Sequence, residues 1–210
     1  MICLFGGTFD PVHSGHLHAA IEVCEELGVD SIHLVLSARP AHRDVTSATI
    51  EQRWDMLQLA CGDDERLLPD DGEVHRSGPS FTVATLAAMH EQHPDDSLVW
   101  VIGSDAYALL PQWYEWQRVP SLASLVVLQR PGHDLEISSE MREFTAARQV
   151  TELTDSRVGQ VLVLASVMQS VSAEEIRTIL AEGGCADHLL PAVVATYISQ
   201  HGLYGGISDP

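Results

Sequence analysis

Lysine is absent from this chain of 210 residues, and all eleven of its basic residues are arginines. Aspartate and glutamate number 30, which gives a formal net charge of -19. Nucleic acids and anionic membranes are bound by extended positive surfaces, so we expect neither as a partner. An anionic small molecule is still compatible with this charge if the few positive groups are concentrated. Arginine, histidine or backbone N–H groups would then have to bind it.

Cysteine and long apolar runs are also scarce. The four cysteines, Cys3, Cys24, Cys61 and Cys185, form no CxxC or zinc-ribbon spacing, so we expect small buried side chains in a reducing compartment. No apolar stretch approaches the ~20 residues that span a bilayer, and no basic segment precedes the first apolar run. We therefore expect a cytoplasmic protein with no membrane partner.

The segment 1–20, MICLFGGTFDPVHSGHLHAA, combines a strand, a turn and a helix start. Residues 2–5 predict a buried strand that Gly6-Gly7 ends. An apolar pattern of helical period follows, and Gly28 can end that helix as a C-terminal cap. In a parallel sheet this unit offers backbone N–H groups and a helix dipole to a phosphate. Two simpler readings stay open. The glycines alone could form an ordinary turn, and His13 and His16 could lie on a helix surface or cap the helix.

Polar side chains also follow three other predicted strands. They are Arg39, His42 and Arg43 after residues 31–37, Asp105 after residues 98–102, and Arg130 after residues 125–128. The arginine loop could be an ordinary solvated loop, and Asp105 could bind a ribose hydroxyl or cap a helix over 106–110. Because parallel strands end at one edge of a sheet, we expect these groups to converge on a single ligand site.

The remaining pattern predicts an α/β fold with a doubly wound, mostly parallel sheet and helices on both faces. We expect helices over 49–61, after residues 80–82 with Ser80 or Thr82 as cap, from Ser172, and from Pro191 to Gly202. The last strand is predicted at 161–164. We expect a single domain over 1–210, with a helical portion at 165–204 and a loose tail at 205–210.

Residues 6–16, GGTFDPVHSGH, resemble the GGTFDPxHxGH signature of the nucleotidyltransferase superfamily. The rest of the chain is similar to bacterial nicotinate mononucleotide adenylyltransferases along almost its whole length. The segments that carry this similarity are PAHR at 40–43, SFT at 80–82, GSD at 103–105 with Trp113, Arg130-Pro131, SAEEIR at 172–177, and the closing YI and GLY at 197–198 and 202–204.

The resemblance implies a Rossmann-like nucleotidyltransferase fold and the transfer of the adenylyl group of ATP to nicotinate mononucleotide. The products are nicotinate adenine dinucleotide and pyrophosphate, in NAD biosynthesis, with Mg²⁺ accompanying ATP. The implied catalytic residues are His13, His16 and Arg177. The implied ATP-binding residues are Gly6, Gly7, Thr8, Phe9, His13, His16, Asp105, Ser172 and Arg177. The implied mononucleotide-binding residues are Ser37, His42, Arg43, Thr82, Trp113 and Arg130.

Two positions depart from the family pattern: Ser37 stands where Asn is frequent, and Glu174 stands where Thr is usual. These departures keep open an adenylyltransferase for another acceptor, such as nicotinamide mononucleotide or phosphopantetheine, and a nucleotide-binding module with weak turnover. A zinc hydrolase built on His13, His16 and His18 is a third alternative, although no HExxH spacing is present. Neither the oligomeric state nor the numerical acceptor preference follows from the sequence.

Overall fold

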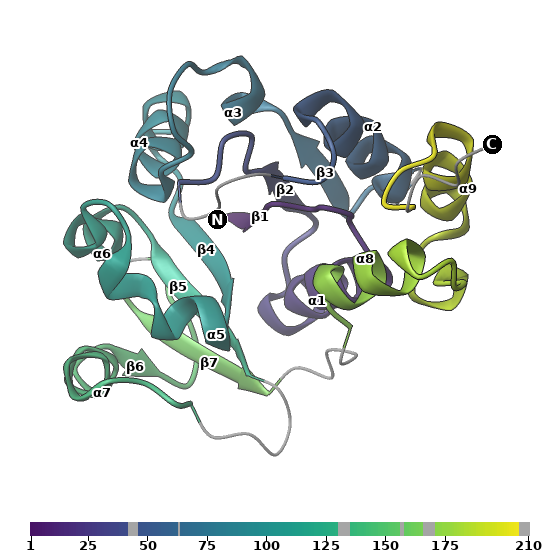
Figure 1. The fold of residues 1–210 in the computed structure, drawn as a ribbon. Coiled ribbons are helices and arrows are strands. Elements are labelled where there is room, and N and C mark those ends of the chain that lie inside the picture. Colours follow the sequence, from purple (N-terminus) through teal and green to yellow (C-terminus); the bar gives the residue numbers. More distant parts are fainter. Residues whose placement is uncertain (42–45, 63, 130–134, 156–157, 166–170, 206–210) are drawn as a thin grey trace.

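The computed structural model describes residues 1–41, 46–62, 64–129, 135–155, 158–165 and 171–205. Within these ranges, seven strands form one sheet in the order β3-β2-β1-β4-β5-β7-β6 (Figure 1), and neighbouring strands pair in parallel. The strands are β1 (Ile2–Gly7), β2 (Ile32–Leu36), β3 (Leu67–Asp70), β4 (Leu98–Gly103), β5 (Ser124–Gln129), β6 (Gln149–Val150) and β7 (Val161–Ala165). The predicted parallel α/β sheet is confirmed.

Helices cover both faces of this sheet. One face carries α1 (Ser14–Leu27), α2 (Ile50–Cys61), α8 (Ala173–Ala181) and α9 (Ala192–His201). The other carries α4 (Thr82–Gln92), α5 (Ser104–Ala108), α6 (Val119–Leu122) and α7 (Ser139–Ala146). The short helix α3 (Gly72–His75) follows β3, and 3-10 turns lie at Leu110–Gln112, Trp116–Arg118 and Asp187–Leu189. Figure 1 shows α9 beside α2, and Arg177 on α8 donates a hydrogen bond to the Asp10 carbonyl, so the end of the chain lies against its beginning.

The side chains of each strand alternate between two hydrophobic cores. In β1, Cys3 and Phe5 belong to the core under α1 and α2, whereas Leu4 belongs to the core under α4 and α6. In β4 every residue from Leu98 to Ile102 is buried, as expected for a strand covered on both faces. Burying such side chains stabilises the fold by roughly 1.5–3 kcal/mol each. This alternation is the physical basis of the doubly wound architecture.

The strand order reverses at β1. The chain builds β2 and β3 on one side of β1, then crosses to place β4 and β5 on the other side. A crevice forms outside the carboxyl ends of the strands at such a reversal, and it is where open α/β sheets bind ligands. Gly7, at the end of β1, therefore stands at the predicted position of the site.

Three predicted helix ends are confirmed. Gly28 ends α1 in the left-handed conformation, with φ of 63°, and Gly202 ends α9 in the same way, with φ of 59°. Ser172 caps α8, because its hydroxyl accepts a hydrogen bond from the Glu175 N–H at 3.1 Å. Pro191, expected at the first helical position, lies one residue earlier, at the N-cap of α9.

The predicted cap of α4 is wrong. Phe81 occupies the N-cap position, and Thr82 is the first helical residue. The Ser80 hydroxyl instead accepts a hydrogen bond from the Arg39 N–H at 2.9 Å, which connects this turn to the loop after β2. Ser80 lies one residue before the N-cap and makes no capping hydrogen bond, so its hydroxyl serves a tertiary contact instead.

Three of the four cysteines are buried, as expected. The expectation is wrong for Cys185, which is exposed. No helix in the described part of the chain is long and apolar enough to cross a bilayer. The expected organisation as one domain with a helical portion at 165–204 stays a prediction, and residues 206–210 of the expected tail lie outside the described residues.

Candidate functional site

A cavity of about 530 Å³ opens at the carboxyl ends of β1 and β2, beside β4 and the start of α4. It brings together residues that the sequence assigned to two different ligands. From the predicted ATP side they are Gly6, Gly7 and Thr8, and from the predicted mononucleotide side they are Ser37, Thr82 and Trp113. Three predicted residues from each side therefore border one space, whereas the predicted ATP-binding residues Phe9, Asp105, Ser172 and Arg177 do not line it.

The two glycines belong to the strand rather than ending it, because β1 runs to Gly7. Their small size has a direct packing reason. A Cβ at Gly6 would lie 2.3 Å from Cζ2 of Trp100, and one at Gly7 would lie 2.6 Å from the Phe9 ring. Glycine thus allows two aromatic rings to pack directly against the strand, and one of them, Trp100, lines the cavity.

Aromatic side chains form one wall of the cavity. Trp113 follows the 3-10 turn after α5, and Tyr114 stacks on Phe81 with ring centroids 4.4 Å apart and an angle of 22° between the planes. Flat apolar surfaces of this kind accommodate a planar heteroaromatic ring. Sequence reasoning singled out Trp113 alone, although Phe81 lay within the SFT segment and Tyr114 directly followed Trp113.

Arg39 stabilises the loop that borders the cavity. Its guanidinium donates hydrogen bonds to the backbone carbonyls of Arg76 at 2.9 Å and Glu73 at 3.3 Å. The Glu73 carboxylate accepts a hydrogen bond from Thr85 and lies 3.5 Å from the Arg76 guanidinium. The positive charge of Arg39, which the sequence presented as available for a ligand, is therefore bound to the protein's own backbone.

His13 and His16 stack at the start of α1. Their ring centroids are 3.6 Å apart, and the backbone N–H of His13 donates a hydrogen bond to Nδ1 of His16 at 3.3 Å. Burial lowers the pKa of His13 to about 4, and burial together with His13 lowers the pKa of His16 well below its ordinary value. At neutral pH both rings are neutral, so each offers one N–H donor and no full charge. Neither residue lines the cavity.

Asp10 connects the signature segment to two distant parts of the chain. Its carboxylate, 3% exposed, accepts hydrogen bonds from the N–H groups of Ser47 at 2.7 Å and Ala48 at 3.1 Å, and from the Tyr204 hydroxyl at 2.8 Å. Its backbone carbonyl accepts a hydrogen bond from Nη1 of Arg177 at 2.6 Å. Arg177 is therefore held against the same segment that carries both histidines.

Arg53 is a component that the sequence analysis missed. It lies on α2 and is completely buried, and its guanidinium donates hydrogen bonds to backbone carbonyls at the ends of β1 and β2. One signal was present in the sequence. Arg53 falls three residues after Ile50 and four before Leu57, on the apolar face of the predicted helix, where an unpaired cation is rare.

The other predicted residues divide into described and undescribed positions. Asp105 lies inside the first turn of α5, whose N-cap is Gly103, so its expected role as the cap of a helix over 106–110 is wrong. Glu174 is exposed in the first turn of α8, and its side chain faces solvent. His42, Arg43 and Arg130 lie outside the described residues.

The zinc alternative finds no support in the part of the chain that the structure describes. No group of three or more His, Cys, Asp or Glu side chains is placed there to hold a metal ion. His18, the third histidine of that alternative, is exposed on α1.

Comparisons with known proteins agree with this geometry. The profile of the cytidylyltransferase-like family matches residues 4–179. A probable nicotinate-nucleotide adenylyltransferase of Marinobacter nauticus is 43% identical over 209 residues, covering 98% of this chain and 97% of the relative. A protein of the same name from Pseudomonas syringae pv. tomato is 42% identical over 206 residues, covering 97% and 93%.

Solved structures show the same fold at low sequence identity. The nicotinic acid mononucleotide adenylyltransferase of Plasmodium falciparum complexed with NaAD superimposes with a TM-score of 0.76 at 17% identity, over 97% of this chain and 96% of that one. A structure from Vibrio parahaemolyticus, described as a putative nicotinate-nucleotide adenylyltransferase, gives a TM-score of 0.64 at 16% identity, over 97% and 94%. The Rossmann-like nucleotidyltransferase fold and the predicted family are confirmed. The chain belongs to the cytidylyltransferase-like family and, within it, to the bacterial nicotinate-nucleotide adenylyltransferases.

Proposed function

We propose that this protein transfers the adenylyl group of ATP to nicotinate mononucleotide, giving nicotinate adenine dinucleotide and pyrophosphate in NAD biosynthesis. The observation that carries the proposal is the single cavity in which Gly6, Gly7 and Thr8 meet Ser37, Thr82 and Trp113. A reaction that joins two nucleotides requires two such half-sites to share one space. The cytoplasmic location stays a prediction.

The acceptor half of the cavity suits a pyridine carboxylate. Trp113 offers its ring plane for stacking. Thr82 begins α4, and the N-cap residue Phe81 has no side-chain acceptor for the first N–H groups of the helix. These N–H groups, at the positive end of the helix dipole, are suited to bind the carboxylate. Ser37 at the end of β2 faces the same space, and we propose that His42, Arg43 and Arg130 approach the mononucleotide phosphate.

The ATP half relies on backbone and neutral donors. We propose that Gly6, Gly7, Thr8 and Phe9 contact the nucleotide through the backbone and that Asp105 accepts a hydrogen bond from a ribose hydroxyl. Since their pKa values are lowered, His13 and His16 act as neutral N–H donors to the phosphates. Ser172 and Arg177, at the start of α8, then bind the pyrophosphate end.

The reaction requires the protein to position the two substrates relative to each other. A phosphate oxygen of the mononucleotide attacks the α-phosphorus of ATP, a new P–O bond forms, and the bond from that phosphorus to the oxygen bridging to the β-phosphate breaks. Pyrophosphate leaves with the electron pair. No protein nucleophile is needed, so alignment of the two phosphates and stabilisation of the charge on the leaving group account for the catalysis.

We propose that Mg²⁺ enters with ATP. Mg²⁺ is commonly bound through substrate phosphates and water with only one or two carboxylates, so the absence of a metal cage among the described residues is compatible with it. When bound, the ion neutralises phosphate charge. Because the chain has no lysine and only eleven arginines, it has few positive side chains of its own to neutralise this charge.

Pyrophosphate release tests the proposal with a panel of acceptors: nicotinate mononucleotide, nicotinamide mononucleotide and phosphopantetheine. We expect the highest kcat/KM with nicotinate mononucleotide. We expect His16→Ala and Arg177→Ala to lower turnover on the order of 10²–10³-fold while the fold is kept. His18→Ala is the matched control, because His18 is exposed on the same helix and should leave turnover unchanged.

Three results would contradict this assignment. ATP binding without product from any acceptor would indicate a binding module. A preference for another acceptor would change the substrate. Parent-like turnover of His16→Ala or Arg177→Ala would remove these residues from the catalytic set.

A further inference from the structure

Arg53 has an unusual environment for a charged side chain. It is 0% exposed, and its Nη1 donates hydrogen bonds to the backbone carbonyls of Thr8 at 2.9 Å and Ser37 at 2.8 Å. Its Nη2 donates to the carbonyl of Ala38 at 2.7 Å. None of the ion pairs among the described residues includes Arg53. One guanidinium thus joins the ends of β1 and β2 through backbone atoms.

The contacts of Arg53 fix the orientation of the peptide groups that border the cavity. In a trans peptide the C=O and the N–H of one plane point in opposite directions. Three carbonyls directed at Arg53 therefore turn the N–H groups of Phe9, Ala38 and Arg39 away from it. For the last of these the structure shows the consequence, since the Arg39 N–H donates to the Ser80 hydroxyl on the cavity wall at 2.9 Å.

The Thr8–Phe9 peptide has the strongest need for such an anchor. Phe9 has a φ of 47°, in the left-handed region that residues other than glycine seldom adopt. Consecutive N–H groups in a loop that enters this region form a concave binding site for anions. The hydrogen bond from Arg53 to the Thr8 carbonyl holds the peptide that precedes this turn.

Only a planar guanidinium can donate to all three carbonyls, those of Thr8, Ser37 and Ala38, at once. It has five N–H donors in a fixed arrangement and stays charged when buried, whereas an ammonium is a compact donor that cannot reach carbonyls of separate strands in the same way. The nearest carboxylate of the signature segment, Asp10, is already bound by two N–H groups and the Tyr204 hydroxyl. Burial lowers the pKa of Arg53, and the negative charge of the Asp10 carboxylate opposes this shift, so Arg53 contacts backbone carbonyls while Asp10 favours its charged form.

We propose that Arg53 is a positioning residue for both substrates: from behind the cavity it orients the loops after β1 and β2 so that their N–H groups face the phosphates of ATP and of the mononucleotide. The identity of these two ligands rests on the proposed function. The role itself rests on the three carbonyl contacts and on the cavity-lining residues Thr8 and Ser37. Arg53 contacts neither ligand directly and acts through the backbone.

The test compares Arg53→Lys and Arg53→Ala with the parent chain. Steady-state pyrophosphate release gives kcat and both KM values, and calorimetric titration gives the affinities for ATP and for nicotinate mononucleotide without turnover. In both variants we expect KM and the dissociation constants of both ligands to rise about tenfold or more, because both loops lose their anchor. We then expect guanidinium ion, well below denaturing concentrations, to restore binding to Arg53→Ala, whereas methylammonium and sodium at the same concentration do not.

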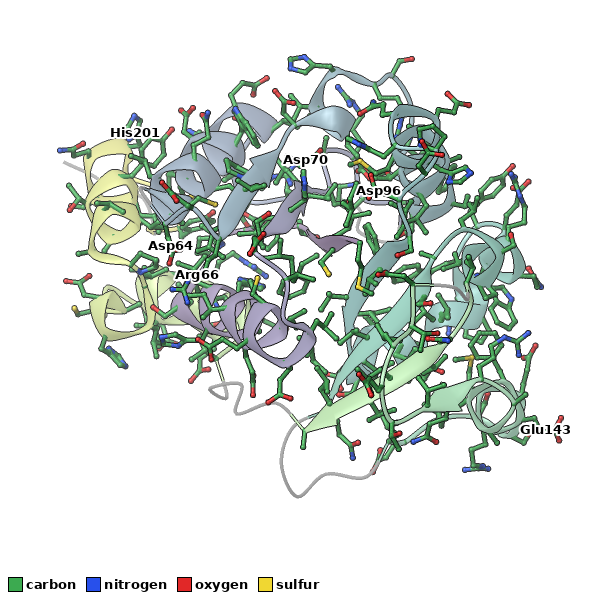
Figure 2. The ribbon with its side chains drawn as sticks, turned by 180° about the vertical axis from the view of Figure 1, so that it is seen from behind. Asp64, Arg66, Asp70, Asp96, Glu143 and His201 are labelled. Atoms are coloured by element: carbon green, nitrogen blue, oxygen red, sulfur yellow. The ribbon has the colours of Figure 1, made fainter. Side chains whose placement is uncertain are left out.

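Arg66→Ala is the matched control. Figure 2 shows Arg66 next to Asp64, and their ion pair of 2.8 Å stands at the surface, just before β3. This variant removes the same charge away from the cavity, and we expect parent-like binding constants.

Four outcomes bear on the proposal. Parent-like constants in a folded Arg53→Lys, or a folded Arg53→Ala that guanidinium does not rescue, would overturn it. Failure of both variants to fold would overturn it too, since Arg53 would then be needed for the whole fold and not for two loops. If the parent released no pyrophosphate but both titrations still weakened in the variants, the proposed function would fail and the role of Arg53 would stand.

Discussion

Tyr204 and Tyr197 each donate a hydrogen bond to a carboxylate over the same distance, but one carboxylate is buried and the other is exposed. Removing each hydroxyl in turn therefore shows how much burial adds to the stabilisation that such a hydrogen bond gives. The Tyr204 hydroxyl lies 2.8 Å from Oδ1 of Asp10, whose exposed fraction is 3%. The Tyr197 hydroxyl also lies 2.8 Å from a carboxylate, Oδ2 of Asp55, but Asp55 is exposed. Burial and the adjacent carboxylate raise the pKa of both phenols, that of Tyr197 to about 12.

The expected losses follow from what replaces each hydrogen bond. In Tyr204→Phe the Asp10 carboxylate keeps two N–H donors but loses a partner that water cannot readily replace, so the free energy of unfolding should fall by about 2 kcal/mol. For a chain of this size that loss lowers the Tm by roughly 4–8 °C. In Tyr197→Phe water solvates Asp55, and the loss should stay within about 0.5 kcal/mol.

Urea denaturation followed by tryptophan fluorescence measures both variants against the parent, and scanning calorimetry gives the Tm. A double-mutant cycle with Asp10→Asn should show a coupling energy above about 1 kcal/mol for Tyr204 and none for Tyr197. Turnover should also fall in Tyr204→Phe, because Arg177 is bound to the carbonyl of Asp10. Equal losses of stability in the two phenylalanine variants would refute the reasoning.

Three further predictions concern packing, pH and salt. Gly6→Ala places a methyl group 2.3 Å from the Trp100 ring, so urea denaturation should show that the free energy of unfolding falls by about 1–3 kcal/mol. Gly103→Ala is the control, because its added Cβ meets no described atom within 4 Å and the free energy of unfolding should stay the same. Equal stability of the two variants would contradict the clash. Burial lowers the pKa of His13 to about 4, so between about pH 6.5 and about pH 4 the unfolded chain binds a proton at this ring that the native state does not bind. The free energy of unfolding should therefore fall by up to about 3 kcal/mol over this range. His13→Gln should reduce this slope, and an unchanged slope would assign it to other groups. Because the net charge is -19, raising NaCl from about 0.05 M to about 1 M should screen self-repulsion and raise the Tm in calorimetry, and a constant or falling Tm would show that the acidic surface costs little stability.

The central part of the fold was predictable because local pattern and tertiary environment agree there. The strands β1, β4 and β5 are buried on both faces, so their sequences are continuous apolar runs that no solvent-exposed segment would contain. The start of α1 was predictable from its glycines and histidines, and the end of that helix from Gly28.

The edge strands gave no such signal. The strand β3 is four residues long, contains Pro69 and is mostly half-buried, so it shows neither alternation nor a long apolar run. The strand β6 has two residues, Gln149 and Val150, and exists only because it pairs with β7. Backbone pairing at the edge of a sheet depends on the neighbouring strand and leaves little trace in its own side chains.

The convergence of the candidate site was predictable from the sequence, whereas the roles assigned to its residues stay predictions. The ends of parallel strands had to converge, which brings Thr8, Ser37 and Thr82 to one cavity. The local sequence did not indicate that Arg39 binds carbonyls of another turn or that Arg53 supports two loops from behind. Such contacts depend on which helix packs under which strand end. His42, Arg43 and Arg130 keep their expected roles as predictions.

The contact between Asp10 and Tyr204 can form only near the end of synthesis. These residues are 194 positions apart, and domains form from the N-terminus as the chain emerges from the ribosome. The first strands can pair early, but the carboxylate near the nucleotide segment receives its third donor only after almost the whole chain has been made. A nascent chain that ends before residue 204 therefore lacks one of the three donors that hold the Asp10 carboxylate in the folded protein.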